Sequence, residues 1–328
     1  MAKPKISFTC TLYDRLMPLY LGEAQVEGFD IDFEGSYGWQ SVRSIFDRVG
    51  AGKGADISEM SSSEYISSTA AGTCQHIALP VFPSRAFRSG YTFVNADKIK
   101  HPKDLEGKRI GVPLFTMTAA IMARGHLSDE YGVDFSNVEW VQGAMNETGS
   151  HGKPAAPPLI KPTKITNNDS GRSLSDLLVA GEIDAVLGAI TPDAFGKDHK
   201  IQRLFPDYHD VELQYYRRTR VFPIMHTIVI KRSVHQEHPG LGQALYKAMT
   251  KSKRIALERF TDVASLQYML PWLMRDVEEI QSEFGGDPWP YGLEPNRPTL
   301  EALTRYLHEQ GLTAKKMDID TLFIPVTD

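Results

Sequence analysis

The chain has 328 residues, of which 36 are basic and 41 acidic, so its formal net charge is -5. Hydrophobic residues make up 41% of the chain and charged residues 23%, which is typical of a folded globular protein and excludes a largely disordered one. The acidic balance, with no basic stripe, argues against nucleic-acid binding. No apolar run approaches the roughly 18 residues that a membrane-spanning helix needs. We therefore expect neither nucleic acid nor a membrane as a partner.

The cysteines and the first residues predict the compartment. Cys10 and Cys74 are the only cysteines, and two thiols without a Cys-x-x-Cys spacing indicate no disulfide framework. The start of the chain, Met-Ala-Lys-Pro-Lys, leads directly into an alternating strand and lacks the apolar stretch of a secretory signal. We therefore expect a reduced, cytoplasmic location.

Strands and helices alternate over the first hundred residues, which indicates an α/β fold with largely parallel pairing. Ser61 and Glu64 have the spacing of a capping box, in which Ser61 is the N-cap of a helix. The glycine-rich run at 50–54 lacks the residues of a phosphate loop and is predicted to end a helix. Strands are predicted over residues 6–12, 29–33, 55–60, 77–82 and 91–94, and helices over 39–49 and 62–71.

The pattern restarts after residue 101, with a Pro- and Gly-rich excursion over 146–172. Strands are predicted over 109–112, 138–141, 183–187 and 224–230, and helices over about 119–131, after Ser173, and over about 237–260, 262–284 and 298–310. This layout predicts two α/β lobes with a ligand cleft between them. The first would comprise residues 1–92 and 225–328, including the C-terminal helices, and the second 93–224. The chain would cross between them near 89–94 and return near 222–230.

Three loops at strand ends are candidates for ligand binding, namely residues 11–15, 58–62 and 113–118. Ligands of open α/β sheets bind beyond the carboxyl ends of strands. The second and third loops also open helices, and the free N–H groups and dipole of a helix start favour an anion. Two such helix starts on facing lobes would suit a ligand with two carboxylates. Simple helix capping is the alternative for each loop.

Arginine and histidine side chains lie at both predicted crossovers. Arg85 and Arg88 are at the first, and Arg217 and His226 are at the second. Arginine binds a carboxylate through a planar two-point fork, and histidine can transfer a proton near neutral pH. A cluster of salt bridges at the hinge is the alternative. The absence of a Gly-x-Gly-x-x-Gly run after a strand disfavours a nicotinamide enzyme.

Seven stretches of the chain match the pattern of a known family, namely residues 56–61, 80–88, 107–113, 117–120, 215–219, 222–226 and 289–297. Each match alone is weak, but the combination is fairly specific. Together they resemble the 4,5-dihydroxyphthalate decarboxylase family over nearly the whole chain. The resemblance implies a two-lobed type II periplasmic-binding-protein-like fold with two crossovers. It also implies a carboxy-lyase that converts an aromatic dicarboxylate, 4,5-dihydroxyphthalate, into 3,4-dihydroxybenzoate and carbon dioxide. A solute-binding protein for a small aromatic or anionic ligand is the alternative.

The implied reaction needs an acid near the ring carbon, a base near the phenol and cations for the retained carboxylate. We predict His226 as the proton donor and Glu59 or Asp14 as the base. No cofactor is predicted, although a divalent metal bridging the two phenol oxygens is an alternative to the base. The sequence also allows self-association into a homo-oligomer. The predicted substrate-binding residues are Arg15, Ser61, Ser62, Arg85, Arg88, Thr116, Thr118 and Arg217.

Overall fold

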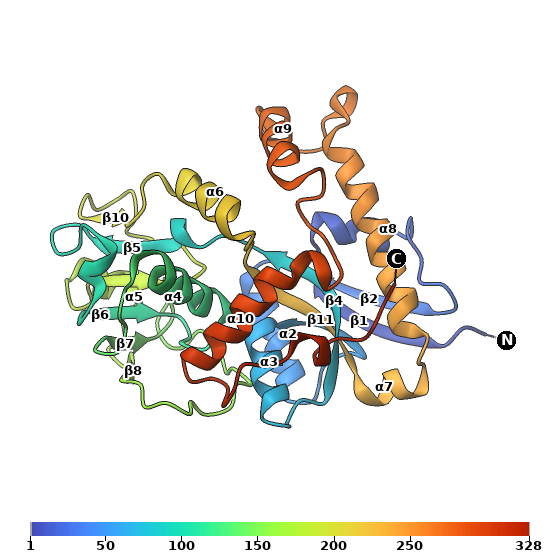
Figure 1. Ribbon diagram of the computed structural model, residues 1–328, viewed down its shortest axis with the longest axis horizontal. Coiled ribbons are helices and arrows are strands. Elements are labelled where there is room, and N and C mark those ends of the chain that lie inside the picture. Colours follow the sequence, from blue (N-terminus) through green and yellow to red (C-terminus); the bar gives the residue numbers. More distant parts are fainter. Residues whose placement is uncertain (1, 328) are drawn as a thin grey trace.

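The computed structural model describes residues 2–327, and its backbone is built around two mixed β-sheets. The first sheet has the strand order β2-β1-β3-β11-β4 and the second the order β10-β5-β9-β6-β7-β8. Figure 1 shows the second sheet and its helices on the left and the first sheet on the right. The α/β fold with two lobes that the alternation predicts is confirmed.

The first sheet combines early strands with one strand that returns late in the chain. β1 pairs in parallel with β2 and β3, whereas β11 lies antiparallel between β3 and β4. The carboxyl ends of β1 and β3 therefore lie at the same edge as the start of β11. The strands are β1 (Lys5–Thr11), β2 (Asp30–Ser36), β3 (Ile57–Ser61), β4 (His76–Arg85) and β11 (Ile224–Lys231), and the helices around them are α1 (Met17–Tyr20), α2 (Trp39–Gly50), α3 (Ser62–Ala70), α7 (Arg232–Glu237) and α8 (Leu241–Phe260).

The second sheet is formed by the middle of the chain. β6 pairs in parallel with β7 and β9, β7 continues in parallel to β8, and β5 is antiparallel to its neighbours β9 and β10. The strands are β5 (Thr92–Asn95), β6 (Arg109–Val112), β7 (Glu139–Gln142), β8 (Ile165–Asn167), β9 (Ala185–Leu187) and β10 (Ile201–Arg203), and the helices are α4 (Thr118–Tyr131), α5 (Leu174–Val179) and α6 (Tyr208–Thr219).

Two short crossovers join the lobes. Residues 86–91 lead from β4 to β5, and residues 220–223 lead from α6 to β11. Arg220 ends α6 in a left-handed conformation, with φ of 57°, which turns the chain back toward the first sheet. The rings of Phe87 and Phe222, one from each crossover, stack with their centroids 4.7 Å apart. The two crossovers therefore form one packed hinge.

The C-terminal helices contact both lobes. α8 packs on the first lobe, against β4 and α1, whereas α10 (Arg297–Glu309) packs against both α3 and α4. Gly125 of α4 makes this approach close, because a Cβ there would lie 2.4 Å from ring carbons of Tyr306. A hydrophobic cluster that includes Tyr65, Met122 and Leu303 continues from α3 through α10 to α4. The predicted return of the C-terminal helices to the first lobe therefore describes α8 and only part of α10.

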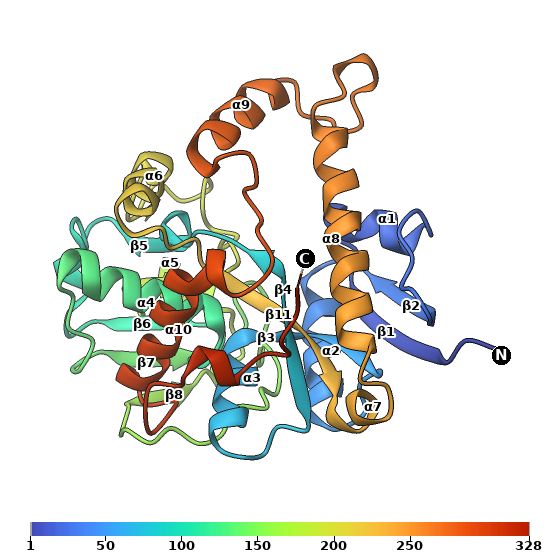
Figure 2. The same ribbon diagram turned by 45° about the vertical axis from the view of Figure 1, so that its right-hand side comes forward.

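Two predicted helices are shorter in the structure than the periodicity suggests. The helix predicted over 262–284 begins only at Leu273 as α9 (Leu273–Phe284), because Pro271 cannot donate a helical hydrogen bond. The segment before it contains one 3-10 turn, Val263–Ser265. The helix predicted over 237–260 is divided into α7 and α8, with Pro239 and Gly240 between them. Figure 2 shows α9 extending from the end of α8 toward α6.

Within residues 2–327, none of the helices is both long enough and apolar enough to cross a bilayer.

Candidate active site

A buried carboxylate meets a histidine where β3 and β11 run side by side. The antiparallel register places His226 opposite Ser61 and Ile228 opposite Glu59, so Glu59 and His226 are diagonal neighbours on one face of the sheet. His226 Nδ1 lies 2.6 Å from Glu59 Oε1. The Glu59 side chain is 0% exposed, whereas that of His226 is 18% exposed. The histidine therefore lies between the carboxylate and the solvent-accessible side of the site.

The end of β1 supplies the other partners of Glu59. Tyr13 donates its hydroxyl to Oε1 at 2.7 Å, and the Thr11 N–H donates to Oε2 at 3.0 Å. Cys10 Sγ also lies 3.4 Å from Oε2. Burial tends to raise the pKa of Glu59, but the attraction of His226 and the hydrogen bonds from His226, Thr11 and Tyr13 outweigh it and lower the pKa to about 2. Glu59 is thus an ionised hydrogen-bond acceptor.

This environment defines the tautomer of His226. An ionised carboxylate can only accept, so Nδ1 carries the hydrogen of the bond to Glu59. Phe46 contacts the ring edge-on, with the centroids 4.8 Å apart. Among the described side chains, Nε2 has no hydrogen-bond partner. The ring is therefore held at Nδ1, and Nε2 is available to a ligand.

The starts of α3 and α4 meet across the two lobes. Ser61 Oγ lies 3.0 Å from Thr118 Oγ1, which also accepts the Ser63 N–H at 3.0 Å. Ser63 Oγ in turn donates to the Thr116 carbonyl at 2.7 Å, so it is the backbone of Thr116 that is engaged. Ser62 Oγ is buried and lacks a partner among residues 2–327. The two facing helix starts that the sequence predicts are thus adjacent.

The predicted capping box at the start of α3 is wrong. Ser61 makes no side-chain cap bond and instead contacts Ser63 and Thr118. Glu64 pairs with Arg43 at 2.7 Å and accepts the Ala155 N–H at 3.0 Å. Tertiary partners on α2 and in the 146–172 excursion have therefore replaced the local cap.

Among the predicted arginines, Arg88 has the fewest protein partners and so the most hydrogen-bond donors left for a ligand. Within the described residues it has no ion pair, and its Nε lies 3.4 Å from Met225 Sδ, next to His226 in sequence. Its guanidinium carbon lies 5.3 Å from the centre of the Tyr91 ring. Burial lowers the pKa of Arg88 to about 10, against the opposing attraction of Tyr91, Glu212 and Tyr13. It stays cationic at neutral pH, and one of the groups that attract it, Tyr13, is also a hydrogen-bond partner of Glu59.

The other predicted charged residues have protein partners. Arg85 is buried and donates to Asn296 Oδ1 at 2.6 Å and to the Phe222 carbonyl at 2.8 Å. Arg217 is half-exposed and pairs with Glu283 of α9. Arg15 pairs with Asp14 at 2.7 Å. The structure therefore brings together Glu59, His226, Ser61 and Thr118, whereas Arg217 faces α9 on the other side of the hinge.

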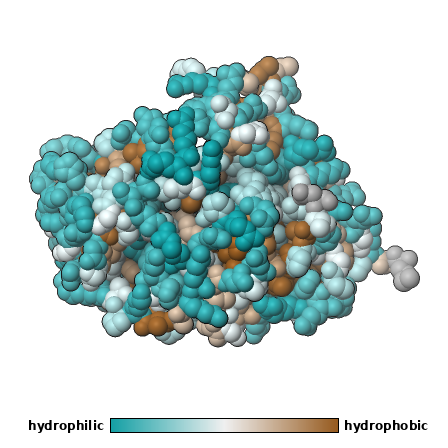
Figure 3. All heavy atoms as spheres, viewed as in Figure 1, coloured by the Kyte–Doolittle hydropathy of each residue, from teal (hydrophilic) through white to brown (hydrophobic). Residues whose placement is uncertain are grey.

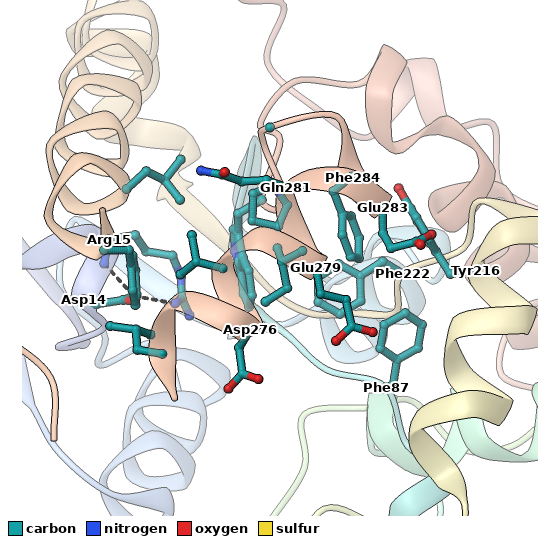
Figure 4. A pocket seen from close by; sticks show the side chains of 18 of the residues that line it. Asp14, Arg15, Phe87, Tyr216, Phe222, Asp276, Glu279, Gln281, Glu283 and Phe284 are labelled. Carbon is teal, nitrogen blue, oxygen red and sulfur yellow. Dashed lines mark hydrogen bonds and ion pairs between the residues drawn. The ribbon is translucent and has the colours of Figure 1, made fainter. Parts of the chain in front are cut away.

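Arg15 separates the Glu59 site from a large cavity. Its guanidinium lies over the ring of Tyr13 at 4.3 Å and over that of Trp289 at 4.1 Å. Beyond Trp289 and beneath α9 lies a cavity of about 600 Å³, which Asp14 and Arg15 line but Glu59 and His226 do not. Figure 4 shows Asp14 and Arg15 on one side of this cavity and Phe87, Tyr216 and Phe284 on the other.

Within residues 2–327, no group of three or more His, Cys, Asp or Glu side chains is arranged to hold a metal ion.

Two residues next to Glu59 are missing from the sequence-based site. Tyr13 belongs to the first strand-end loop but has no predicted role, and Cys10 is considered only for disulfide pairing. Both contact Glu59 because β1 and β3 are neighbours in the sheet. The position of Tyr13 just after a strand was the one available signal.

The two lobes, the short crossovers and the facing helix starts are the features of one fold class. The chain has the fold of the periplasmic binding proteins. The aliphatic sulphonate binding protein SsuA from Escherichia coli is similar in structure, with a TM-score of 0.54 and 11% identity, over 99% of this chain and 94% of that one. The alkanesulfonate-binding protein SsuA from Xanthomonas axonopodis pv. citri, bound to MOPS, gives a TM-score of 0.53 and 10% identity over 100% of both chains. At these identities the likeness shows the fold alone. The family model "NMT1/THI5 like" matches residues 85–151.

Sequence relatives narrow this class. The chain is 36% identical to a 4,5-dihydroxyphthalate decarboxylase of Comamonas testosteroni over 329 residues, which cover 100% of this chain and 98% of the relative. It is 38% identical to one of Pseudomonas putida over 219 residues, which cover 66% of this chain and 83% of the relative. The chain belongs to the 4,5-dihydroxyphthalate decarboxylase family.

Proposed function

We propose that the protein is a carboxy-lyase that converts 4,5-dihydroxyphthalate into 3,4-dihydroxybenzoate and carbon dioxide. The observation that carries the proposal is the Glu59–His226 pair, which presents an unpartnered imidazole nitrogen in a chain of this family. The proposed site lies between two lobes, residues 1–92 with 225–328 and residues 93–224. Closure of the lobes would exclude water from the reacting groups.

The chemistry follows from the substitution pattern of the ring. Each hydroxyl of 4,5-dihydroxyphthalate is para to one carboxylate, so ionising a hydroxyl raises the electron density on the carbon that bears that carboxylate. His226, as the imidazolium with a hydrogen on each ring nitrogen, then donates the Nε2 proton to this carbon. The bond between the ring carbon and the carboxylate breaks, and carbon dioxide leaves. The electron pair of the broken bond stays with the ring and restores its aromaticity. The net reaction consumes one proton, which solvent returns to His226.

The contacts of Glu59 support a positioning role for it rather than the predicted role of phenol base. Its oxygens already accept from His226, Tyr13 and Thr11, and the side chain has no exposed surface. It would hold the ring of His226 and stabilise the imidazolium. Asp14 remains our candidate base, because its Oδ2 has no partner among the described residues while Oδ1 binds Arg15.

We propose two anchors for the substrate carboxylates. Arg88 supplies a cation that has no ion pair among the described residues, and the joined starts of α3 and α4 supply N–H groups and hydroxyls around Ser61, Ser62 and Thr118. Thr116 lies in the loop before α4, whereas Arg15 lies in the 3-10 turn after β1. The hydrogen bonds of Arg85 and the ion pair of Arg217 give both residues structural roles.

The direct test is turnover. Chelator-treated protein is mixed with 4,5-dihydroxyphthalate, with and without added divalent metal, and carbon dioxide and 3,4-dihydroxybenzoate are measured. Product without metal supports proton transfer by side chains alone. Product only with metal keeps the decarboxylase and replaces the phenol base by a chelated catechol. Tight binding without product under both conditions would refute the decarboxylase.

His226→Asn tests the proton donor. Asparagine cannot transfer the proton, so we expect turnover to fall about 100-fold or more. His199→Asn is the matched control, because the side chain of His199 is 90% exposed on the second lobe. Near-full activity of His226→Asn would refute the assignment.

A solute-binding protein is the second candidate, and the shared fold with the SsuA proteins favours it. It predicts stoichiometric binding of 4,5-dihydroxyphthalate with no loss of carbon dioxide. His226→Asn would then alter affinity alone. Quantifying product over many enzyme equivalents separates the two functions.

We also propose self-association and a cytoplasmic location. Large apolar side chains are exposed on the segment between α8 and α9, namely Val263, Leu266, Met269, Leu270 and Trp272. Figure 3 shows hydrophobic residues at the tip of this segment, at the top of the view. Analytical ultracentrifugation of the protein and of Met269→Asp tests the assembly, and fractionation of the source cells tests the location.

A further inference from the structure

The cavity beneath α9 has the dimensions and lining of a small-molecule site that is separate from the Glu59–His226 pair. Its volume of about 600 Å³ lies within the roughly 300–1,000 Å³ that such sites occupy. Its walls come from α6, α8, α9 and both crossovers, so residues distant in the sequence enclose it (Figure 4). Asp14 and Arg15 belong to its lining, whereas Glu59 and His226 do not.

One wall of the cavity is a continuous aromatic surface. Phe222 stacks on Phe87 at 4.7 Å and contacts Phe284 at 5.6 Å and Trp289 at 5.4 Å, while Tyr216 stacks on Phe284 at 4.3 Å. Aliphatic residues of α8 and α9, such as Leu257 and Val277, complete the lining. Such a surface favours a flat aromatic or apolar body.

The charges that line the cavity are unbalanced toward the acidic side. Its two cationic residues other than histidine, Arg15 and Lys253, are already bound to Asp14 at 2.7 Å and to Asp287 at 2.5 Å. Glu279 faces His209 at 3.3 Å, and Glu283 binds Arg217.

Among residues 2–327, the lining carboxylate of Asp276 has no ion-pair partner, whereas Glu212 accepts the Gly90 N–H at 3.2 Å and is attracted to Arg88. Asp276 stands on the first turn of α9 and is exposed, and Figure 4 shows its carboxylate apart from the aromatic wall. A dicarboxylate would be repelled here, whereas an ammonium would be attracted.

From this combination we propose that the cavity is a binding site for a hydrophobic amine, whose aromatic body lies on the Phe222 wall and whose ammonium is near Asp276. The site touches Phe87 and Phe222 of the two crossovers, so its occupant bears on the hinge between the lobes. The proposal is independent of the reaction catalysed.

Three probes of equal shape test the charge preference. 2-Naphthylmethylammonium, 2-naphthalenemethanol and 2-naphthoate share one ring system and differ in charge. Isothermal titration of the full chain should give one saturable site with the ammonium bound about fivefold more tightly than the alcohol, and the carboxylate bound most weakly. Equal affinity for all three probes, or no saturable binding of the ammonium at millimolar concentration, would overturn the proposal.

Two neighbouring substitutions on α9 locate the site. Asp276→Asn should remove most of the preference for the ammonium over the alcohol, because the amide keeps the shape and loses the charge. Glu278→Gln is the matched control, since Glu278 is exposed on the same helix and lies outside the cavity lining. Both positions are at the surface, so thermal melting should be unchanged. An ammonium preference that survives Asp276→Asn would place the probe elsewhere and refute the site.

Discussion

The pair formed by Glu59 and His226 illustrates how burial changes the role of a residue. From sequence, Glu59 is a candidate base because desolvation in a closing cleft can raise the pKa of a carboxylate. In the structure, Glu59 is fully buried, accepts three hydrogen bonds from His226, Tyr13 and Thr11, and has its pKa lowered to about 2. A group this stable as an anion is a poor proton acceptor at neutral pH, and it is well suited to orient and stabilise an imidazolium.

Replacing Glu59 by glutamine should therefore lower kcat with little effect on KM. We expect a loss of about 100-fold or more in kcat, because an amide can neither fix the tautomer of His226 nor stabilise its cation. Glu59→Asp should recover part of kcat, since it restores the charge at a shorter reach. Steady-state kinetics measure both parameters. Glu27→Gln, at an exposed position, serves as the control. A rise in KM for Glu59→Gln as large as its fall in kcat would contradict the positioning role.

Arg88 and Arg217 make a matched pair of arginines with opposite expectations. Arg88→Gln should raise KM about 10- to 100-fold, because a hydrogen bond to the substrate's carboxylate would be lost. Arg217→Gln should leave KM within about twofold, since it removes only an exposed ion pair with Glu283. Kinetics with 4,5-dihydroxyphthalate test both. A large KM effect of Arg217→Gln would show that α6 contributes to the substrate site.

Single residues of the site could be predicted from chemistry, but their partners could not. His226 and Glu59 are candidates from sequence because Glu59 lies near the end of one predicted strand and His226 near the start of another, both at the predicted cleft. The partners of Arg85 and Arg217 are invisible in sequence, because Asn296 and Glu283 lie 211 and 66 residues away. Whether an arginine is free for a ligand is a property of packing.

At the scale of elements, the starts of α3 and α4 form the contact that joins the two lobes at the site. Local pattern predicts both helix starts correctly, since each follows a strand and opens with Ser or Thr. It predicts the wrong partner for Ser61, because the capping box considers only residues three positions apart. In the folded protein Thr118 supplies a partner 57 residues away. Local propensity thus located these elements, and tertiary contact determined their hydrogen bonds.

Thr118→Val should destabilise this junction. Valine has nearly the same shape as threonine but leaves the Ser63 N–H and the Ser61 hydroxyl without their buried partner. We expect a loss of about 1–3 kcal/mol in the free energy of unfolding. Urea denaturation measures it, and Thr118→Ser should restore most of the loss because it keeps the hydroxyl. Equal stability of Thr118→Val and the parent protein would show that the contact contributes nothing.

The whole molecule depends on contacts that no periodicity reveals. The strand–helix alternation predicts the two lobes, because the order of elements restricts how strands can be connected. It does not predict β10 or α6, and the expected largely parallel pairing is only partly found, since β5 and β11 are antiparallel to their neighbours. It does not predict that α10 lies between α3 and α4, where Gly125 admits the ring of Tyr306. Nor does it predict that α9 covers the hinge. These helices pack across the lobes, so their positions follow from the shapes of surfaces formed by the rest of the chain.

Two buried histidines should make the stability of the whole molecule depend on pH. Burial lowers the pKa of His76 and of His126 to about 4, well below the ordinary value for histidine. Between about pH 6.5 and 4 the unfolded chain therefore binds more protons than the folded one. The stability from these groups is fully present above pH 6.5 and is lost as the pH falls toward 4. For one buried histidine, a pKa shift of this size corresponds to about 3 kcal/mol in the free energy of unfolding.

The histidine contribution can be separated by substitution. His76→Leu removes a titratable group whose Nε2 is buried and has no partner among the described residues. The free energy of unfolding of His76→Leu should therefore fall less steeply between pH 6.5 and 4 than that of the parent, as urea denaturation across that range would measure. His199→Gln, at an exposed position, should keep the parent slope. Below about pH 4.5 both proteins should lose stability together, because Glu59, with its pKa lowered to about 2, is protonated first in the unfolded chain. A parent slope that His76→Leu leaves unchanged would assign the pH dependence to other groups.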